Sequence, residues 1–286
     1  MSAASTYLAF GSDVVAEANR RYYGQTAERY ESTETCVIDP HSQSYLEDRI
    51  SVALSALRTP GPGRPTALDA CAGSGNVALK LAARGCDVTA CDITPELLAI
   101  MTRKSAGLAF PPRQVCSELA DFLSDGDRSF DLVTISSALH HLGDVDDTIR
   151  LLARSVAPGG VFMSVFDPTP SDERRGVASL ALKADYVAFK VRSHPGDVVP
   201  GIMRKLRRGR NQATAALDQD ALGATAEFHA DSGLDDFHLV KLLTDEGLLL
   251  LSHERTADAR YSATRRILTR FGQPTMFSLI ARRPVG

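Results

Sequence analysis

The sequence predicts an α/β protein built on a doubly wound parallel sheet. The first observation is an apolar run that starts at Thr66, ends near Asp69 and leads into a turn containing Gly73 and Gly75. The second is another apolar run that ends in a carboxylate, Asp92, 23 residues after Asp69. Strand-length runs then alternate with helical patterns to about residue 167, an order typical of parallel strands joined by right-handed crossovers. In such a sheet the ligand crevice lies at the carboxyl ends of the strands.

The segment that precedes this core, residues 1–65, is predicted to be a helical arm. Apolar residues recur at roughly helical spacing between residues 13 and 31, with polar residues between them. Residues 59–65, Thr-Pro-Gly-Pro-Gly-Arg-Pro, then form a linker rich in residues that break helices and strands. We therefore expect the core to begin at residue 66.

The glycine turn and Asp92 together predict a nucleoside-binding site. Glycine lacks a Cβ, so Gly73 and Gly75 let the main chain approach a ligand closely or adopt a positive φ. Residues 76–84 are predicted to form a helix, and residues 87–91 the second strand. Asp92 would then lie beside the turn, where its carboxylate could accept hydrogen bonds from both ribose hydroxyls.

The remaining elements continue the core, with one interruption. Thr94 and Pro95 are predicted to open a helix, as its N-cap and its first residue. Residues 171–225 are Ala-rich and charged and are expected to be mainly helical. Strands are also predicted at 129–135, 248–252 and 275–282, and a helix at 234–246. One more strand is predicted directly after a helix that ends in Pro158-Gly159-Gly160.

Composition favours a small-molecule partner. The chain has 286 residues, of which 44% are hydrophobic, so it can bury a large core. Its formal charge of −3 provides no general attraction to nucleic acid or to an anionic membrane. The basic run at 203–210 lacks interleaved aromatic residues and is interpreted as a solvated helix face. With no signal peptide pattern and no long apolar run, a cytoplasmic protein is expected. The sequence leaves open whether the protein forms a homodimer.

The five cysteines indicate neither disulfides nor a metal centre. They are odd in number, scattered and without a C-x-x-C pair, so reduced, buried thiols are expected. No H-E-x-x-H motif or carboxylate cluster at ligand spacing occurs either, and no metal is predicted.

Several motifs, in order, resemble those of the class I S-adenosylmethionine-dependent methyltransferases of the small-molecule type. They are Asp69-Ala-Cys-Ala-Gly-Ser-Gly75, Cys91-Asp-Ile-Thr-Pro95, Ser129–Ile135, Ala138-Leu-His-His-Leu142 and Leu152–Val161. The family pattern has glycine where this chain has Cys71. The resemblance implies a Rossmann-like seven-stranded sheet with an antiparallel last strand, S-adenosyl-L-methionine as cofactor, and a small-molecule methyl acceptor. It also implies a cofactor-binding core at 66–167, a helical cap insertion at 168–225 and a return to the sheet at 226–286.

A dinucleotide-binding dehydrogenase fits less well, because only one of the three glycines of its G-x-G-x-x-G turn would be present.

The same resemblance implies cofactor contacts. Asp69, Ala70 and Gly73 would lie beside the methionine moiety, Asp92 would bind the ribose and Ile93 would pack on adenine. Ser117 and Glu118 are chosen for the adenine edge, with Asp121 as the rival. The remaining cofactor residues are the backbone of Ser136, and Tyr22 and Tyr30 of an arm that would fold over the cofactor.

Methyl transfer to oxygen needs a base, and His140 and His141 follow the fourth predicted strand. His141 is the candidate, because the second histidine of this pair often faces the donor site in similar proteins; a role in ordering the loop is the alternative. Tyr23 and His229 are the candidate substrate residues. O-methylation of a specialised metabolite is the expected reaction. N-methylation, a cyclisation or rearrangement on the same fold, and a binding protein without chemistry remain the alternatives.

Overall fold

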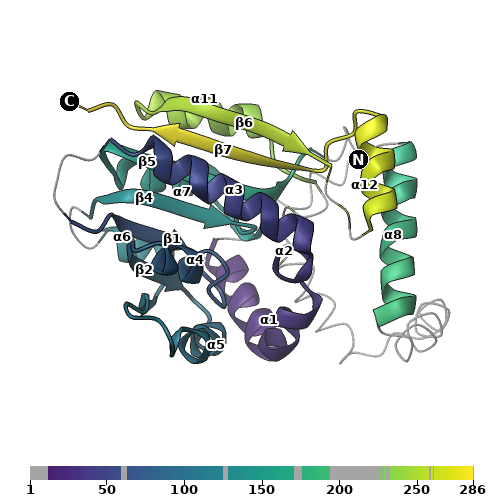
Figure 1. The fold of residues 1–286 in the computed structure, drawn as a ribbon, viewed down its shortest axis with the longest axis horizontal. Coiled ribbons are helices and arrows are strands. Elements are labelled where there is room, and N and C mark those ends of the chain that lie inside the picture. The colour runs from purple at the N-terminus through teal and green to yellow at the C-terminus, as the bar shows by residue number, and fades with distance from the viewer. Residues whose placement is uncertain are drawn as a thin grey trace.

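The computed structural model describes residues 12–58, 63–124, 128–170, 176–193, 226, 229, 232–257, 259 and 261–285. Their centre is a seven-stranded sheet in the order β3-β2-β1-β4-β5-β7-β6, with helices on both faces (Figure 1). Strand order reverses between β1 and β4, which makes the carboxyl ends of these two strands the expected ligand crevice. The predicted doubly wound, Rossmann-like seven-stranded sheet is confirmed.

The first five strands are parallel and the last two pairings are antiparallel. β7 pairs antiparallel with both β5 and β6, as expected for the last strand of the chain. The central strand β1 is buried at four of its five positions, because helices cover both faces of the sheet. The strands are β1 (Thr66–Ala70), β2 (Asp87–Asp92), β3 (Arg113–Cys116), β4 (Phe130–Ser136), β5 (Val156–Pro168), β6 (Leu249–Thr256) and β7 (Met276–Arg282).

The helices bury two apolar clusters, one on each face of the sheet. One cluster joins α3, α4 and α5 to the sheet, and the other joins α6, α7 and α11. The helices are α1 (Ser12–Thr33), α2 (Thr35–Ile38), α3 (Pro40–Ala56), α4 (Ala78–Ala83), α5 (Pro95–Ser105), α6 (Leu119–Ser124), α7 (Val145–Arg154), α8 (Val177–Ser193), α11 (Asp236–Asp245) and α12 (Ser262–Arg270), with a 3-10 turn η3 (Leu139–His141). The predicted helix over residues 13–31 is therefore confirmed as α1.

The helix before β5 ends earlier than predicted. α7 stops at Arg154, and Pro158-Gly159-Gly160 lies inside β5, at an irregularity of its pairing with β4. Gly159 has φ 78°, and a Cβ there would lie 2.5 Å from the carbonyl oxygen of Arg58. Gly159 thus forms a close crossing with the segment after α3, and Gly160 lies close to the backbone of Asp131, so the two glycines do not end a helix.

The cap expected at 168–225 is described only in part. Its described helix, α8, packs against α12, and both lie at the right of Figure 1. Residues 171–175 and 194–225 of the predicted cap fall outside the described ranges, and so does the basic run at 203–210. The domain boundaries, including this cap, stay predictions.

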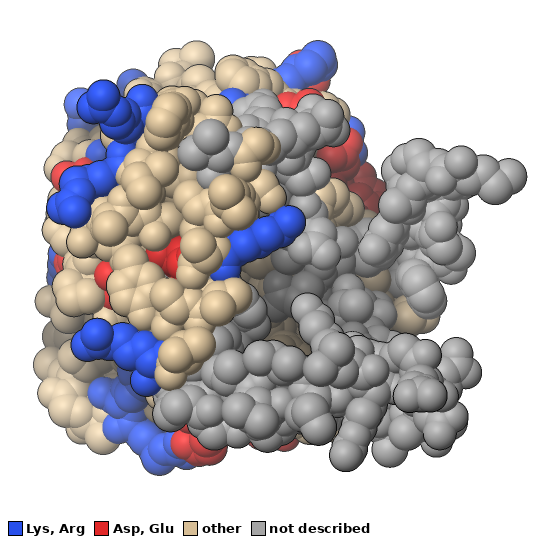
Figure 2. All heavy atoms as spheres, turned by 90° about the vertical axis from the view of Figure 1, so that its right-hand side faces the viewer, with Lys and Arg blue, Asp and Glu red and all other residues tan. Residues whose placement is uncertain are grey.

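Surface charge is mixed where it is visible. Figure 2 shows Lys and Arg in several separate groups over one face, among uncharged atoms. Within the described ranges, no helix is both long enough and apolar enough to cross a membrane. None of the five cysteines is in a disulfide; Cys86 and Cys91 are buried as expected, whereas Cys116 is exposed at the end of an edge strand, so the expectation of burial was wrong there.

Candidate functional site

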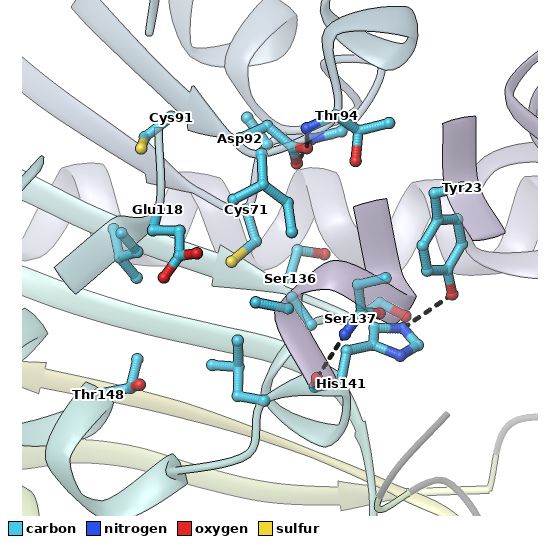
Figure 3. Close-up of a pocket in the computed structure, with 18 of the residues that line it drawn as sticks. Tyr23, Cys71, Cys91, Asp92, Thr94, Glu118, Ser136, Ser137, His141 and Thr148 are labelled. Atoms are coloured by element: carbon cyan, nitrogen blue, oxygen red, sulfur yellow. Dashed lines mark hydrogen bonds between the residues drawn. The ribbon is translucent and has the colours of Figure 1, made fainter. Parts of the chain in front are cut away.

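A cavity of about 420 Å³ lies at the carboxyl ends of β1, β2 and β4 and beneath α1. Figure 3 shows side chains from these elements converging on it, with Asp92 and Glu118 toward one end and Tyr23 and His141 toward the other. Its volume falls in the range of small-molecule sites. Ten of the predicted site residues line it: Tyr23, Tyr30, Asp69, Gly73, Asp92, Ile93, Ser117, Glu118, Ser136 and His141.

The loop after β1 is held in an unusual backbone conformation. Gly73 and Gly75 have φ values of 53° and 90°, as the sequence pattern predicts. Cys71, where the family pattern has glycine, also has a positive φ of 52°. This backbone conformation costs about 1 kcal/mol or more for a residue with a Cβ. The departure from the motif therefore keeps the backbone shape. The Cys71 thiol lines the cavity, and burial raises its pKa well above the usual value.

The carboxylate of Asp69 forms hydrogen bonds with the start of α4 and with the neighbouring strand β4. One carboxylate oxygen accepts from the backbone N–H of Ala78 at 2.9 Å, and the other accepts from the Thr134 hydroxyl at 2.8 Å. The side chain is 2% exposed, and burial raises its pKa to about 7. Asp69 thus links β1, β4 and the start of α4, while a direct contact with the methionine moiety stays a prediction.

Asp92 braces the same loop from β2 and also faces the cavity. Its carboxylate accepts from the backbone N–H of Gly73 at 2.8 Å and from that of Thr94 at 2.8 Å. Burial raises its pKa. The Thr94 side chain and the backbone of Ile93 also bond to this carboxylate. Asp92 lines the cavity at the end of β2, which is the position expected for a ribose-binding residue.

His141 lies in the cavity between two fixed partners. Its Nδ1 is 2.9 Å from the carbonyl oxygen of Ala226, and its Nε2 is 3.2 Å from the Tyr23 hydroxyl (Figure 3). A carbonyl only accepts, so Nδ1 carries the proton. In the neutral imidazole Nε2 then accepts from the Tyr23 hydroxyl, which places a basic nitrogen and a phenol side by side in the cavity.

His140 serves a different purpose. It is 8% exposed, and its Nδ1 lies 2.9 Å from Asp167, whose side chain is fully buried. The backbone N–H of His140 donates to the same carboxylate oxygen at 3.3 Å. These bonds anchor η3 to β5, and the anchored turn leaves the next residue, His141, facing the cavity.

Three predicted site residues do not line this cavity. Ala70 is fully buried in the apolar cluster beneath the sheet, because neighbouring strand residues point to opposite faces. Tyr22 packs edge-on against Tyr23 at 5.2 Å between ring centroids, away from the lining. His229 lies in a neighbouring shallow hollow and donates its backbone N–H to the His140 carbonyl; burial lowers the pKa of its side chain.

Sequence reasoning missed part of the lining. The periodicity of α1 places Val15 and Asn19 on the same face as the predicted Tyr23, and that signal could have identified both. α7 and its N-terminal loop supply another group, which no motif indicates: Gly143, Asp144, Asp147, Thr148 and Leu151. No cluster of three or more His, Cys, Asp or Glu suited to a metal occurs among the residues described.

The C-terminal half of α1 is fastened to the glycine loop. Glu31 accepts a hydrogen bond from the Ser74 hydroxyl and pairs with Lys104 of α5 at 2.9 Å. The Lys104 ammonium also donates to the Ser74 carbonyl at 3.2 Å. The arm predicted to fold over the ligand therefore contacts the ligand loop directly.

Residues 68–164 match the sequence profile of the methyltransferase domain, a span that starts in β1 and ends in β5. Residues 68–164 are therefore similar to a methyltransferase domain, and they include the strands and loops that line most of the cavity.

Two curated relatives are similar to part of this chain. A ubiquinone biosynthesis O-methyltransferase of Xanthomonas oryzae is 30% identical over 122 residues, 42% of this chain and 49% of that protein. A ubiquinone/menaquinone biosynthesis C-methyltransferase of Nitrobacter hamburgensis is 31% identical over 153 residues, 52% of this chain and 58% of that protein. The chain spans about half the length of the curated relatives that it matches.

Solved structures share the fold around the methyltransferase domain. Magnesium protoporphyrin IX methyltransferase from Synechocystis PCC 6803, solved with bound S-adenosylhomocysteine, has a TM-score of 0.56 at 15% identity and covers 94% of this chain and 99% of its own. The cyclase SpnF has a TM-score of 0.56 at 16% identity, covering 93% of this chain and 95% of its own. The class I methyltransferase fold is therefore shared, and the chemistry has to be argued from the site.

Proposed function

We propose that this protein is an S-adenosylmethionine-dependent methyltransferase that methylates an oxygen atom of a small molecule. The observation that carries the proposal is that one cavity contains both Asp92, at the end of β2, and His141, with Nε2 as its basic nitrogen. The first suits a nucleoside and the second suits removal of a proton. The O- and C-methyltransferases among the relatives support methyl transfer to a small molecule.

The residues present fit the cofactor. Gly73 lacks a Cβ on the cavity wall, Asp92 can bind ribose hydroxyls, and Ile93 provides an apolar surface for adenine. Ser117 and Glu118 line the cavity near Ile93 and are proposed for the adenine edge, and Tyr30 and the backbone of Ser136 for other parts of the cofactor. When bound, S-adenosylmethionine supplies an electrophilic methyl group on a sulfonium. The protein has to hold the acceptor in line with that group and to accept its proton.

Proton removal is proposed to pass through Tyr23. The Nε2 lone pair of His141 is directed at the Tyr23 hydroxyl, so that hydroxyl can give its proton to Nε2 while its oxygen takes the proton of an acceptor hydroxyl. The acceptor oxygen forms its bond to the methyl carbon as it loses this proton. The protonated imidazole keeps its Nδ1–H bond to the Ala226 carbonyl, which favours the charged ring. Tyr23 is thereby assigned to the acceptor, and His141 is the general base.

A cyclisation or rearrangement is the second candidate. SpnF has the same fold and is described as a cyclase, so the fold is compatible with chemistry other than methyl transfer. A specialised metabolite as acceptor, a cytoplasmic location and His229 as a substrate residue stay predictions.

The experiment is a product assay with purified protein, S-adenosylmethionine and a panel of phenols, carboxylic acids and amines. Formation of S-adenosylhomocysteine together with an O-methylated product, and its loss in His141→Ala, supports the proposal. Methylation only of nitrogen or carbon contradicts the choice of oxygen. Conversion of a compound without S-adenosylhomocysteine would favour the cyclase instead.

A further inference from the structure

The end of the cavity that holds the Tyr23–His141 pair has an apolar wall (Figure 3). The first turns of α1 lie beside η3 here, because Nδ2 of Asn19 donates to the carbonyl oxygens of Val15 at 2.9 Å and His141 at 2.8 Å. Two residues of α1 and the two residues that flank η3 supply the wall. These four residues, called the apolar wall below, line the cavity and are Val15, Ala16, Ala138 and Leu142.

Aromatic rings border the apolar wall. Tyr23 and Tyr30 both line the cavity, and their rings pack edge-on with centroids 5.8 Å apart. The Tyr23 ring also packs edge-on against the His141 ring, which lines the cavity as well. Aliphatic and aromatic side chains around a few polar groups are typical of sites that bind a planar, apolar molecule.

A charged methyl acceptor fits this end of the cavity poorly. A carboxylate held against the apolar wall would lose its water without gaining a partner there, which is costly. Glu118, Asp144 and Asp147 line the same cavity, so an anion would also meet like charges. Asp144 and Asp147 are exposed and their repulsion is screened by salt, so the apolar wall is the stronger reason. Both effects favour an uncharged methyl acceptor.

The proposed proton path favours a phenol over an alcohol. In that path the methyl acceptor gives its proton to the Tyr23 oxygen while the Tyr23 proton passes to Nε2 of His141. Phenols, tyrosine included, have ordinary pKa values of about 10, so two phenols hold a proton about equally well. An alcohol is a far weaker acid, close to water at about 16, and its proton would move uphill.

We propose that the methyl acceptor is a neutral phenol whose ring lies against the apolar wall. The inference rests on the proposed function and names the substrate class of the same site. The phenol oxygen forms its bond to the methyl carbon as the carbon–sulfur bond breaks, and the sulfur keeps the electron pair of that bond. The phenol proton goes to the Tyr23 oxygen, and the Tyr23 proton goes to His141.

The test begins with NMR titration of the protein loaded with S-adenosylhomocysteine. The two probes are methyl para-hydroxybenzoate and para-hydroxybenzoate, which share the ring and the phenol, while only the second carries a negative charge at neutral pH. The wild-type protein should bind the ester about tenfold or more tightly than the acid, because the acid has to bury its carboxylate.

A third probe separates phenols from alcohols. Methyl para-(hydroxymethyl)benzoate is a neutral ester of nearly the same shape whose hydroxyl is that of an alcohol. With S-adenosylmethionine present, the phenol ester should be methylated about tenfold or more faster than the alcohol ester.

Two lysine variants of α1 test where the ring lies. Ala16→Lys places a cation on the apolar wall and should abolish the preference for the ester, because the ammonium can pair with the carboxylate of the acid. Val14→Lys is the matched control and should keep the preference, because Val14 is exposed and is not among the residues that line the cavity. Thermal unfolding of both variants checks that they are folded.

Each other result has a defined meaning. Equal binding of the two phenols by the wild type, tighter binding of the acid, or binding of neither up to about 10 mM would overturn the inference. Equal methylation of the phenol and alcohol esters would overturn it too, as would equal effects of the two lysines. In all these cases bound S-adenosylhomocysteine leaves the proposed function standing. Failure of the wild-type protein to bind S-adenosylhomocysteine would be the failure of the proposed function itself.

Discussion

The Tyr23 hydroxyl and Nε2 of His141 lie 3.2 Å apart in the cavity, although 118 residues separate them in the chain. The His141 ring also packs edge-on against the Tyr23 ring, with centroids 5.4 Å apart. This pair joins α1 to the turn after β4. Together with the bonds of Asn19 and Glu31, it makes the N-terminal arm part of the site.

The first prediction concerns Tyr23→Phe. The variant keeps the ring and its packing but removes the hydroxyl, so kcat should fall about tenfold or more, since general acid–base catalysis contributes about 10²–10⁴-fold. The affinity for S-adenosylhomocysteine should change little. Tyr45→Phe is the matched control, because that hydroxyl bonds Ser278 outside the cavity. Equal rates for the wild type and Tyr23→Phe would exclude the relay.

Much of this site could be predicted from local sequence. Asp92 ends a buried apolar run and Gly73 follows another, and parallel topology alone brings the carboxyl ends of such strands together. His141 follows β4, at the same edge of the sheet. These placements depend on strand order and side-chain period, which short sequence patterns record.

The remainder depends on contacts between distant segments. Asn19 meets the His141 carbonyl across 122 residues, and Glu31 meets Ser74 across 43. No local pattern specifies how α1 rotates against the η3 turn, so periodicity can predict the helix but not its partner. The early end of α7 was missed for a similar reason, since Gly159 is shaped by its crossing with Arg58.

A second prediction tests the glycine loop. Gly75 has φ 90°, and an added Cβ would lie 2.6 Å from Met101 Cγ. Gly75→Ala should therefore lower the free energy of unfolding by about 1–3 kcal/mol. Gly107→Ala is the control, because nothing lies within 4 Å of its Cβ position. Urea unfolding of both variants makes the comparison, and equal midpoints would show that the loop is not constrained in this way.

A third prediction follows from the buried carboxyl group of Asp69. Its pKa is raised from 3.8 to about 7, so the folded state binds the proton more tightly than the unfolded state. The resulting stability is fully present below pH 3.8 and is lost as the pH rises through about 7.

Asp69→Asn removes this ionisation. Relative to the wild type, the variant should gain stability as the pH is raised from 5 to 8, as measured by urea unfolding at each pH. Parallel pH profiles for the two proteins would show that Asp69 does not titrate in this range.

A fourth prediction concerns the contact between α1 and the glycine loop. Glu31→Gln weakens the pairing with Lys104 and should reduce the affinity for S-adenosylhomocysteine a few-fold, since such a pair contributes about 0.2–1 kcal/mol. Glu28→Gln is the control, because the Glu28–Arg103 pair is exposed and does not contact the loop. Titration calorimetry at low and high salt should show the difference between the variants shrinking as salt rises. Identical affinities at low salt would mean that this fastening does not support binding.

The most direct test of the central claim is titration of the wild-type protein and Asp92→Ala with S-adenosylmethionine, S-adenosylhomocysteine and NAD. Binding of the first two at about micromolar concentrations, abolished in Asp92→Ala while the variant remains folded, is the predicted result. Binding of NAD alone, or of none of the three by the wild type, would contradict the methyltransferase proposal.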